Sequence, residues 1–370
     1  MIKKNILSEI HNSGKPYIIY KSSRGFDLYT DFSKKIILNK KNIYKFLNRK
    51  NNTKKSKKTD LLIGFFGYEL LNNLINIKIP KQKNINFPKG IFYKPEKKIS
   101  FNNNLNYKDN NLSSRKIFKI NINRKSYSKI FNKFKKKIKS GETYQIKICT
   151  KYKTLSRINP LDFFCRLSKT NLAPEAFLIK DKNFSIISCS PENLITKNGS
   201  KITTKPIAGT VKKSKYMSKL KALNYFRKNL KETKEHNMIV DMERSDLSRI
   251  CKFGTVKLSK EKVVEEYKDL YHYVSLIKGK LKKNIKNIDI IKAMMPGGSV
   301  IGCPKISTLN LLNRQEKENR NIYTGSFGYI KFNGDMRFNI IIRSILNYKN
   351  ISEISVASGV VVDSNAKHEF

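Results

Sequence analysis

The chain has 370 residues, and its 77 lysines and arginines against 28 acidic residues give a formal net charge of +49. It contains no run of about 18 apolar residues, and its start, MIKKNILSEI, lacks the apolar stretch of a signal peptide, so the sequence argues against a membrane span and favours a cytoplasmic protein. The five cysteines form no C-x-x-C pair and the four histidines are not at ligand spacing, which argues against zinc and favours free thiols.

The positive charge is spread along the whole sequence. Basic residues recur from Lys3 to Lys367, mixed with asparagine and isoleucine, and they do not gather in one tail, patch or repeat. This mixture is typical of proteins encoded by AT-rich genomes. The aromatic residues are not interleaved with lysine and arginine in a recognisable RNA- or DNA-binding motif, so a basic nucleic-acid-binding protein is kept only as the alternative. A positive field would still attract a small anionic substrate.

Residues 1–115 are predicted to be a strand-rich region of the same domain as the rest of the chain. Two short strands are predicted at residues 17–20 and 35–38, and a buried apolar segment at residues 61–71. Two polar loops are predicted at residues 51–58 and 102–115. Beyond it, apolar residues at helical spacing predict a helix over residues 127–139. Residues 143–150 then predict a strand that contains Gln145.

The second half of the chain is predicted to form a hairpin, a long helical region and three strands. The hairpin joins residues 184–189 and 201–204 through a turn at residues 197–200, and the helical region covers roughly residues 214–242. The last strands are predicted at residues 328–332, 338–346 and 354–362. Strands, then helices, then strands again indicate an α+β fold rather than a repeated βαβ unit.

Two acids in the long helical region are candidates for metal binding. Glu232 and Glu235 are three residues apart and therefore adjoin on one helical face. A carboxylate among apolar neighbours loses hydration unless it meets a cation. The pattern alone favours two solvated acids paired with Lys228 or Lys231. The alternative is a divalent ion held by oxygen atoms, which would be Mg²⁺ rather than zinc.

Two glycine-containing segments are typical of turns that can bind anions. PIAGT, residues 206–210, follows a strand-like stretch and offers backbone N–H groups, although alone it is a common turn. PGGSVIGCPK, residues 296–305, has two glycines at G-x-x-x-x-G spacing, but Cys-Pro stands where a phosphate-binding loop needs Lys-Ser or Lys-Thr. Nucleotide binding at the second segment is therefore rejected.

Arg343 lies in the apolar stretch FNIIIRSIL and is predicted to be buried. A buried arginine needs an anionic partner, and a carboxylate held by the planar guanidinium is the natural one. The partner can be structural, with Asp335 or Asp363, or it can be a substrate. The sequence leaves both possibilities open.

Nine segments, taken in order, resemble the chorismate-binding enzyme family: GFFGYEL, GETYQIKICT, SCSPENLITKNGSKITTKPIAGT, KEHNMIVDMERSDLSRI, HYVSLIKGKL, PGGSVIGCPK, YTGSFGYI, NIIIRSI and ASGVVVDS. This family includes the large subunits of anthranilate synthase and aminodeoxychorismate synthase, as well as isochorismate and salicylate synthases. The resemblance covers nearly the whole chain from about Leu61 onward. It implies a chorismate-utilising α+β fold with packed antiparallel sheets surrounded by helices, and it assigns residues 116–370 to the catalytic region.

The resemblance also implies roles for the matching residues. Glu235 matches the Mg²⁺ ligand, with Glu232 its neighbour in the site. Tyr323 and Arg343 match the pair that holds the enolpyruvyl carboxylate, and Glu192 resembles the general acid that helps the ring hydroxyl leave. The other matches line the substrate pocket: Ala208, Gly209, Thr210, His272, Ala357, Ser358 and Gly359. The physics agrees, because a dianionic substrate needs cationic partners and a poor leaving group needs a proton.

The residue type at the position of Gln145 distinguishes the family members that add water from those that add ammonia. Water-adding members resemble one another in having a lysine here as general base, whereas glutamine has no titratable nitrogen. Ammonia is already nucleophilic and needs no base. The resemblance therefore implies amination, with Gln145, Glu192 and His272 as the catalytic residues and a glutamine amidotransferase subunit as the source of ammonia.

Two products stay open. The PGGS segment, the FNIIIR stretch and the lack of a recognisable tryptophan-inhibition motif near the N-terminus favour aminodeoxychorismate, on the route to 4-aminobenzoate and folate. Ala208 in PIAGT instead resembles anthranilate synthase, because some aminodeoxychorismate synthases carry a lysine there. Aminodeoxychorismate is the preferred product.

Two positions depart from the family pattern. Ala357 stands where a glycine is usual, but it keeps the backbone N–H. The sequence ends at Glu369-Phe370, within the acidic C-terminal segment of the family. By family spacing a second Mg²⁺ ligand would follow two positions later, so either the chain is a fragment or, as given, it has an incomplete metal site.

Overall fold

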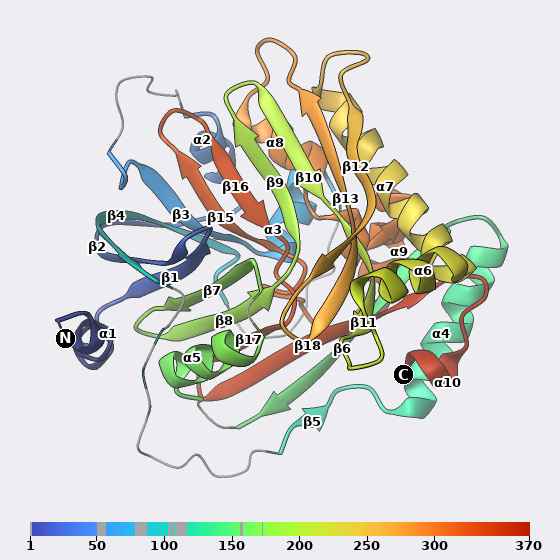
Figure 1. Cartoon of the computed structure of the whole chain (residues 1–370), viewed down its shortest axis with the longest axis horizontal. Coiled ribbons are helices and arrows are strands. Elements are labelled where there is room, and N and C mark those ends of the chain that lie inside the picture. Colours follow the sequence, from blue (N-terminus) through green and yellow to red (C-terminus); the bar gives the residue numbers. More distant parts are fainter. Residues whose placement is uncertain are drawn as a thin grey trace.

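The computed structural model describes residues 2–49, 57–77, 87–102, 105, 107, 117–155, 158–171 and 173–370. Its described strands pair into one hydrogen-bonded system of antiparallel neighbours, with helices packed around it (Figure 1). The fold is α+β, as the order of predicted elements indicates. The first helix and the last lie on opposite sides of the molecule. No described helix is both long and apolar enough to cross a membrane.

The first elements are α1 (Ile2–Asn12), β1 (Tyr17–Ser22), β2 (Gly25–Ile37), α2 (Ile43–Leu47), β3 (Leu61–Phe66), α3 (Tyr68–Leu74), β4 (Gly90–Phe101) and β5 (Lys119–Ile120). The two strands predicted at residues 17–20 and 35–38 lie in β1 and at the end of β2. The buried apolar segment divides into β3 and α3, and Gly67 lies between them. Most residues of the two predicted polar loops, 51–58 and 102–115, lie outside the described residues.

The middle elements are α4 (Arg124–Lys139), β6 (Gln145–Thr154), α5 (Pro160–Thr170), β7 (Glu175–Lys180), β8 (Phe184–Ser190), β9 (Asn193–Asn198), β10 (Lys201–Lys205), β11 (Ile207–Lys212), α6 (Lys219–Lys228), α7 (Leu230–Ile250), β12 (Lys257–Glu266) and β13 (Leu270–Lys280). The predicted helix at 127–139 is confirmed as α4. The predicted hairpin partner is wrong, because the turn joins β9 to β10, whereas β8 pairs with β7 and β17.

The predicted long helical region is two helices, not one. Asn229 lies between α6 and α7 in an extended conformation, and its side-chain oxygen accepts hydrogen bonds from the N–H groups of Lys231 and Glu232. An asparagine at this position satisfies N–H groups that have no partner within the helix. The cap therefore starts α7 two residues before Glu232.

The last elements are α8 (Asn287–Met294), the short 3₁₀ helix η1 (Gly298–Val300), β14 (Gly302–Cys303), α9 (Lys305–Gln315), β15 (Ser326–Lys331), β16 (Met336–Asn339), β17 (Ser344–Tyr348), β18 (Ile351–Val360) and α10 (Ala366–Glu369). The strand predicted at 338–346 is divided, because residues 340–343 leave the sheet and Arg343 has a positive φ of 51°. The break brings this segment against residues 188–192, as described below.

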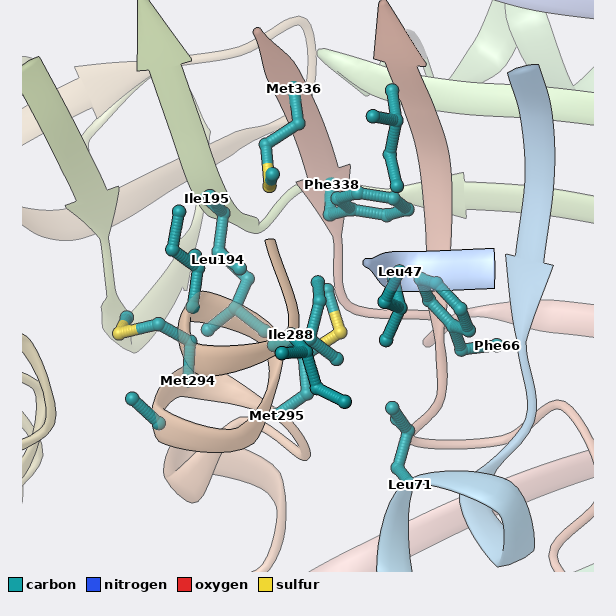
Figure 2. Close-up of a cluster of buried hydrophobic side chains, with 14 of the residues drawn as sticks. Leu47, Phe66, Leu71, Leu194, Ile195, Ile288, Met294, Met295, Met336 and Phe338 are labelled. Atoms are coloured by element: carbon teal, nitrogen blue, oxygen red, sulfur yellow. The ribbon is translucent and has the colours of Figure 1, made fainter. Parts of the chain in front are cut away.

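A shared hydrophobic core connects the two halves of the chain. Phe66 and Leu71 from β3 and α3 pack in the same cluster as Leu194 of β9, Ile288 of α8 and Phe338 of β16 (Figure 2). The sheet is also continuous, since β1 pairs with β7 and β3 pairs with β15. The described strands among the first hundred residues are therefore built into the same sheet as the strands that carry the candidate site.

Candidate active site

The N-terminal part of α7 holds the two acids that the sequence singles out. Glu235 does not pair with Lys228 or Lys231, so the expected pairing was wrong: its Oε1 accepts a hydrogen bond from Lys147 Nζ at 2.8 Å. Lys231 pairs instead with Glu369 at 3.3 Å. The sequence reasoning assigned no role to Lys147, although it stands two residues after Gln145 on the same strand and therefore on the same face.

Two neighbouring strands supply the partners of Glu235. Gln145 and Lys147 lie on β6, and the Gln145 side-chain amide donates to the same Glu235 oxygen at 2.6 Å. Gly359 of β18 lies directly opposite Lys147. A Cβ atom at Gly359 would come within 2.7 Å of Lys147 Nζ and 3.4 Å of Gln145 Nε2. The missing side chain at Gly359 therefore leaves room for the lysine head.

Glu232 and Glu235 differ in their electrostatic surroundings. Burial raises the pKa of the Glu235 carboxyl, but the charge and hydrogen bond of Lys147 and the hydrogen bond of Gln145 outweigh it, so that the pKa lies below its ordinary value. Burial raises the pKa of Glu232, and the neighbouring Glu235 charge raises it further. A negative charge on Glu232 therefore lacks the cation and hydrogen bonds that stabilise the charge on Glu235.

Gly209 makes room for Glu232. It lies in an irregular part of β11, where the register with β13 shifts between Ile207 and Thr210, and its φ is +96°. A Cβ there would come within 2.9 Å of Glu232 Oε2. Ala208, in the same irregular part, is buried and presents only a methyl group. The PIAGT segment thus brings backbone close to α7.

Glu192 lies in the short connection between β8 and β9 and is buried. The Ser299 hydroxyl of η1 donates a hydrogen bond to Glu192 Oε1 at 2.8 Å. Burial raises the pKa of the Glu192 carboxyl to about 7, although Ser299, a backbone N–H and the charges of Lys147 and Arg343 act to lower it. Near neutral pH this carboxyl can hold a proton and can also release it.

Arg343 is exposed, so the prediction that it is buried was wrong. Backbone hydrogen bonds join residues 340–343 to the segment that carries Glu192. The Ile340 N–H donates to the Glu192 carbonyl at 3.1 Å, and the Cys189 N–H donates to the Arg343 carbonyl at 3.1 Å. Within the described part of the chain, no carboxylate forms an ion pair with Arg343, and Asp335 is held by Lys197 and by the Gly199 N–H. Its guanidinium is therefore open to an anion from outside.

His272 lies opposite Thr210 in the pairing of β13 with β11, and the Thr210 hydroxyl is 2.9 Å from His272 Nδ1. Burial lowers the pKa of His272 to about 4, and the charge of Arg343 lowers it as well. The imidazole is therefore neutral at pH 7. Because the Arg343 charge acts on both Glu192 and His272, these three residues share one electrostatic environment.

The remaining predicted residues border this region. Tyr323 is buried, and the Thr324 N–H beside it donates to the Ile341 carbonyl at 2.9 Å, which joins the tyrosine segment to that of Arg343. Ala357 and Ser358 lie on β18, opposite Cys149 and Ile148 of β6. The Ser358 hydroxyl bonds to that of Tyr127 on α4. The structure places no direct contact between the Tyr323 hydroxyl and Arg343 among the residues it describes.

The acids on α7 are a chemically suitable pair for Mg²⁺. Mg²⁺ prefers carboxylate oxygens and is commonly held by one or two of them, together with water and ligand oxygens. Glu232 and Glu235 provide two such groups close together, with Glu232 destabilised by the charge of Glu235. Among the described residues no set of three or more His, Cys, Asp or Glu side chains could hold a metal. The fit therefore rests on two carboxylates.

A family model and known proteins are similar to this chain over most of its length. The chorismate binding enzyme family model matches residues 5–370. The chain is 35% identical over 245 residues to aminodeoxychorismate synthase component 1 of Bacillus subtilis, which covers 66% of this chain and 52% of that protein. It is 30% identical over 335 residues to an anthranilate synthase component I-like protein of Synechocystis, covering 83% and 69% of the two chains. The chain thus spans about half the length of the first of these relatives.

Solved structures show the same fold. Anthranilate synthase component I from Streptococcus pneumoniae superposes with a TM-score of 0.77 at 24% identity, covering 95% of this chain and 87% of that one. A putative isochorismate synthase from Bacillus anthracis superposes with a TM-score of 0.73 at 19% identity, covering 98% and 95%. With the family model matched over nearly its whole length, the chain belongs to the chorismate binding enzyme family.

Proposed function

We propose that this chain aminates chorismate to aminodeoxychorismate with ammonia from a glutamine amidotransferase subunit. The observation that carries the proposal is the arrangement of the two nitrogen-bearing side chains on β6. Gln145 and Lys147 both donate to Glu235 Oε1. The glutamine amide cannot take a proton, and the lysine nitrogen is already engaged in its ion pair with Glu235. Neither residue is thus placed to deprotonate water, whereas ammonia needs no base.

The other residues support replacement of a ring hydroxyl. Glu192, buried and bonded to Ser299, gives its proton to the leaving hydroxyl, which departs as water while ammonia forms the new C–N bond. The surplus proton of the incoming ammonia then leaves to Glu192 or to solvent. Arg343 presents an open guanidinium to a substrate carboxylate. A Mg²⁺ ion, held by Glu232 and Glu235 when bound, would supply positive charge for the other carboxylate.

The product depends on where the amine is attached. In aminodeoxychorismate it lies para to the ring carboxylate, and the enolpyruvyl group is kept. Anthranilate carries it ortho, and pyruvate is released. Ala208 favours anthranilate as the second candidate, because its methyl group offers no amine to the ring. A nucleic-acid-binding function receives no comparable support from the site.

One assay separates these possibilities. Chorismate and Mg²⁺ are incubated with the protein, with and without ammonium, and the products are resolved by chromatography while pyruvate is measured. We expect aminodeoxychorismate with ammonium and unchanged chorismate without it. Anthranilate with an equal amount of pyruvate would replace the first candidate by the second. Isochorismate formed without ammonium would contradict amination.

A further inference from the structure

Lys147 forms an ion pair with Glu235, one of the two carboxylates of the proposed metal site. Its Nζ lies 2.8 Å from Glu235 Oε1, and both side chains are only partly exposed, at 16% and 22%. Among the described residues, Glu235 is the one carboxylate within ion-pair distance of Lys147. The Lys147 ammonium therefore contacts Glu235 Oε1 directly and is not a distant surface charge.

The backbone around Lys147 holds it in this position. Its N–H donates to the Ile301 carbonyl at 3.0 Å, and its carbonyl accepts from the buried Arg320 guanidinium at 3.1 Å. Gly359 on the neighbouring strand leaves the space into which the ammonium extends. The strand is thus fixed on both sides, and the lysine head is directed at α7.

Lys147 also acts on all three acids of the site. Its charge lowers the pKa of Glu235 and opposes the upward shifts of Glu232 and Glu192. A divalent ion bound to Glu235 would lie beside this ammonium, and like charges a few ångströms apart repel strongly away from bulk water. Binding of the ion thus requires Lys147 to move away or the repulsion to be tolerated.

We propose that Lys147 is a built-in competitor of Mg²⁺ for Glu235, which keeps the metal affinity of the free protein low. The inference rests on the proposed metal site at Glu232 and Glu235. It assigns to Lys147 a role in setting metal affinity that is independent of which nucleophile the enzyme uses.

Isothermal titration with Mg²⁺ alone, in the absence of chorismate, tests the proposal. Lys147→Met removes the ammonium but keeps most of the side-chain volume, and it should tighten Mg²⁺ binding about tenfold or more. Lys153→Met is the matched control, because Lys153 lies on the same strand and pairs with Glu318 rather than Glu235. Its affinity for Mg²⁺ should stay within about twofold of the unmodified protein.

A second variant moves the ammonium without removing it. In Gly359→Ala the new methyl group would overlap Lys147 Nζ, which lies at the end of a flexible side chain and can shift. Mg²⁺ binding should tighten here too, by less than in Lys147→Met. Equal affinities of the unmodified protein and Lys147→Met would overturn the proposal, as would an equal gain in Lys153→Met.

Glu235→Gln distinguishes failure of this inference from failure of the metal site. It should abolish Mg²⁺ binding both alone and combined with Lys147→Met. If the double variant binds as tightly as Lys147→Met, the ion does not use Glu235, and the proposed metal site and the competition both fail. Absence of binding by both the unmodified protein and Lys147→Met would likewise overturn both.

Discussion

Glu192 and Glu235 are carboxyl groups of one candidate site, yet their surroundings favour opposite protonation states. Glu192 bonds to the neutral hydroxyl of Ser299, and burial raises its pKa to about 7. Glu235 is only partly buried, and Lys147 and Gln145 bond to it and hold its pKa below the ordinary value. The difference shows that the nature of the neighbour, rather than burial alone, decides whether such an acid donates a proton or binds a cation.

Helix α7 shows the same contrast along its own length. Glu243 lies further along the helix from Glu235 and is buried with Thr204 as its hydrogen-bonding partner at 3.2 Å. Burial and the charge of Asp246 raise its pKa to about 8, while Lys305, which pairs with Asp246, lowers it. One helix therefore carries one carboxyl that is charged at pH 7 and another that is largely neutral.

The largest expected effect is on catalysis by Glu192→Gln. The amide cannot give a proton to the leaving hydroxyl, so kcat should fall by about 10²–10⁴-fold, whereas Mg²⁺ binding should persist. In the unmodified protein, kcat should decline as pH rises above about 7, because the protonated form of Glu192 is lost. Steady-state rates from pH 6 to 9 measure both effects.

Glu69→Gln is the matched control for that experiment. Glu69 is equally buried, with burial raising its pKa to about 7, but it accepts a hydrogen bond from the Asn321 backbone rather than facing Ser299. The kcat of Glu69→Gln should differ little from that of the unmodified protein. A kcat for Glu192→Gln within a few-fold of the unmodified protein would remove the distinction between the two acids of the site.

A smaller effect is expected at Arg343, which lies on the Glu192 side of the site. Arg343→Lys keeps the charge but loses the planar fork, so kcat/KM for chorismate should fall about tenfold. Arg244→Lys, on the exposed face of α7 beside Asp241, is the control and should leave kcat/KM nearly unchanged. Similar kinetics for the two variants would show that Arg343 does not bind the substrate.

The smallest expected effect is a change of stability with pH that originates in Glu243. Because its folded pKa of about 8 lies above its ordinary value of 4.5, the folded protein holds a proton that the unfolded chain releases, and stability falls as pH rises towards 8. Burial lowers the pKa of His236 and His272 to about 4. These two histidines make the stability rise with pH, but only below about pH 6.5, their ordinary pKa. Glu69 and Glu192, whose pKa burial raises to about 7, add a smaller fall in the lower part of the same window. Between pH 6.5 and 8 the part of the fall that originates in Glu243 should be about 2 kcal/mol.

Chemical denaturation at several pH values in that window measures the free energy of unfolding. Glu243→Gln should remove the Glu243 part of the fall, since the amide does not titrate, and should leave the smaller part that Glu69 and Glu192 contribute. The same slope in this variant and in the unmodified protein would mean that Glu243 is ionised in the folded state. In that case, the contrast between Glu243 and Glu235 along α7 would disappear.

The sequence alone determined much of the architecture, where local pattern and local physics agree. Apolar residues at helical spacing predicted α4, and the resemblance predicted one site for Glu192, Glu232, Glu235 and Arg343. Short apolar runs bounded by turns located β1 and most of the C-terminal strands. Such signals survive without tertiary information because each depends on neighbours within a few residues.

Only the tertiary structure decided what those residues meet. Nothing local indicates that residues 340–343 leave the sheet and expose Arg343, because the bonds that hold them come from residues 188–192. Likewise, Lys147 and Glu235 are 88 residues apart, and their contact exists because β6, β18 and α7 converge. The charge state of a carboxyl depends on such distant partners, so the contrast between Glu192 and Glu235 could be derived only from the fold.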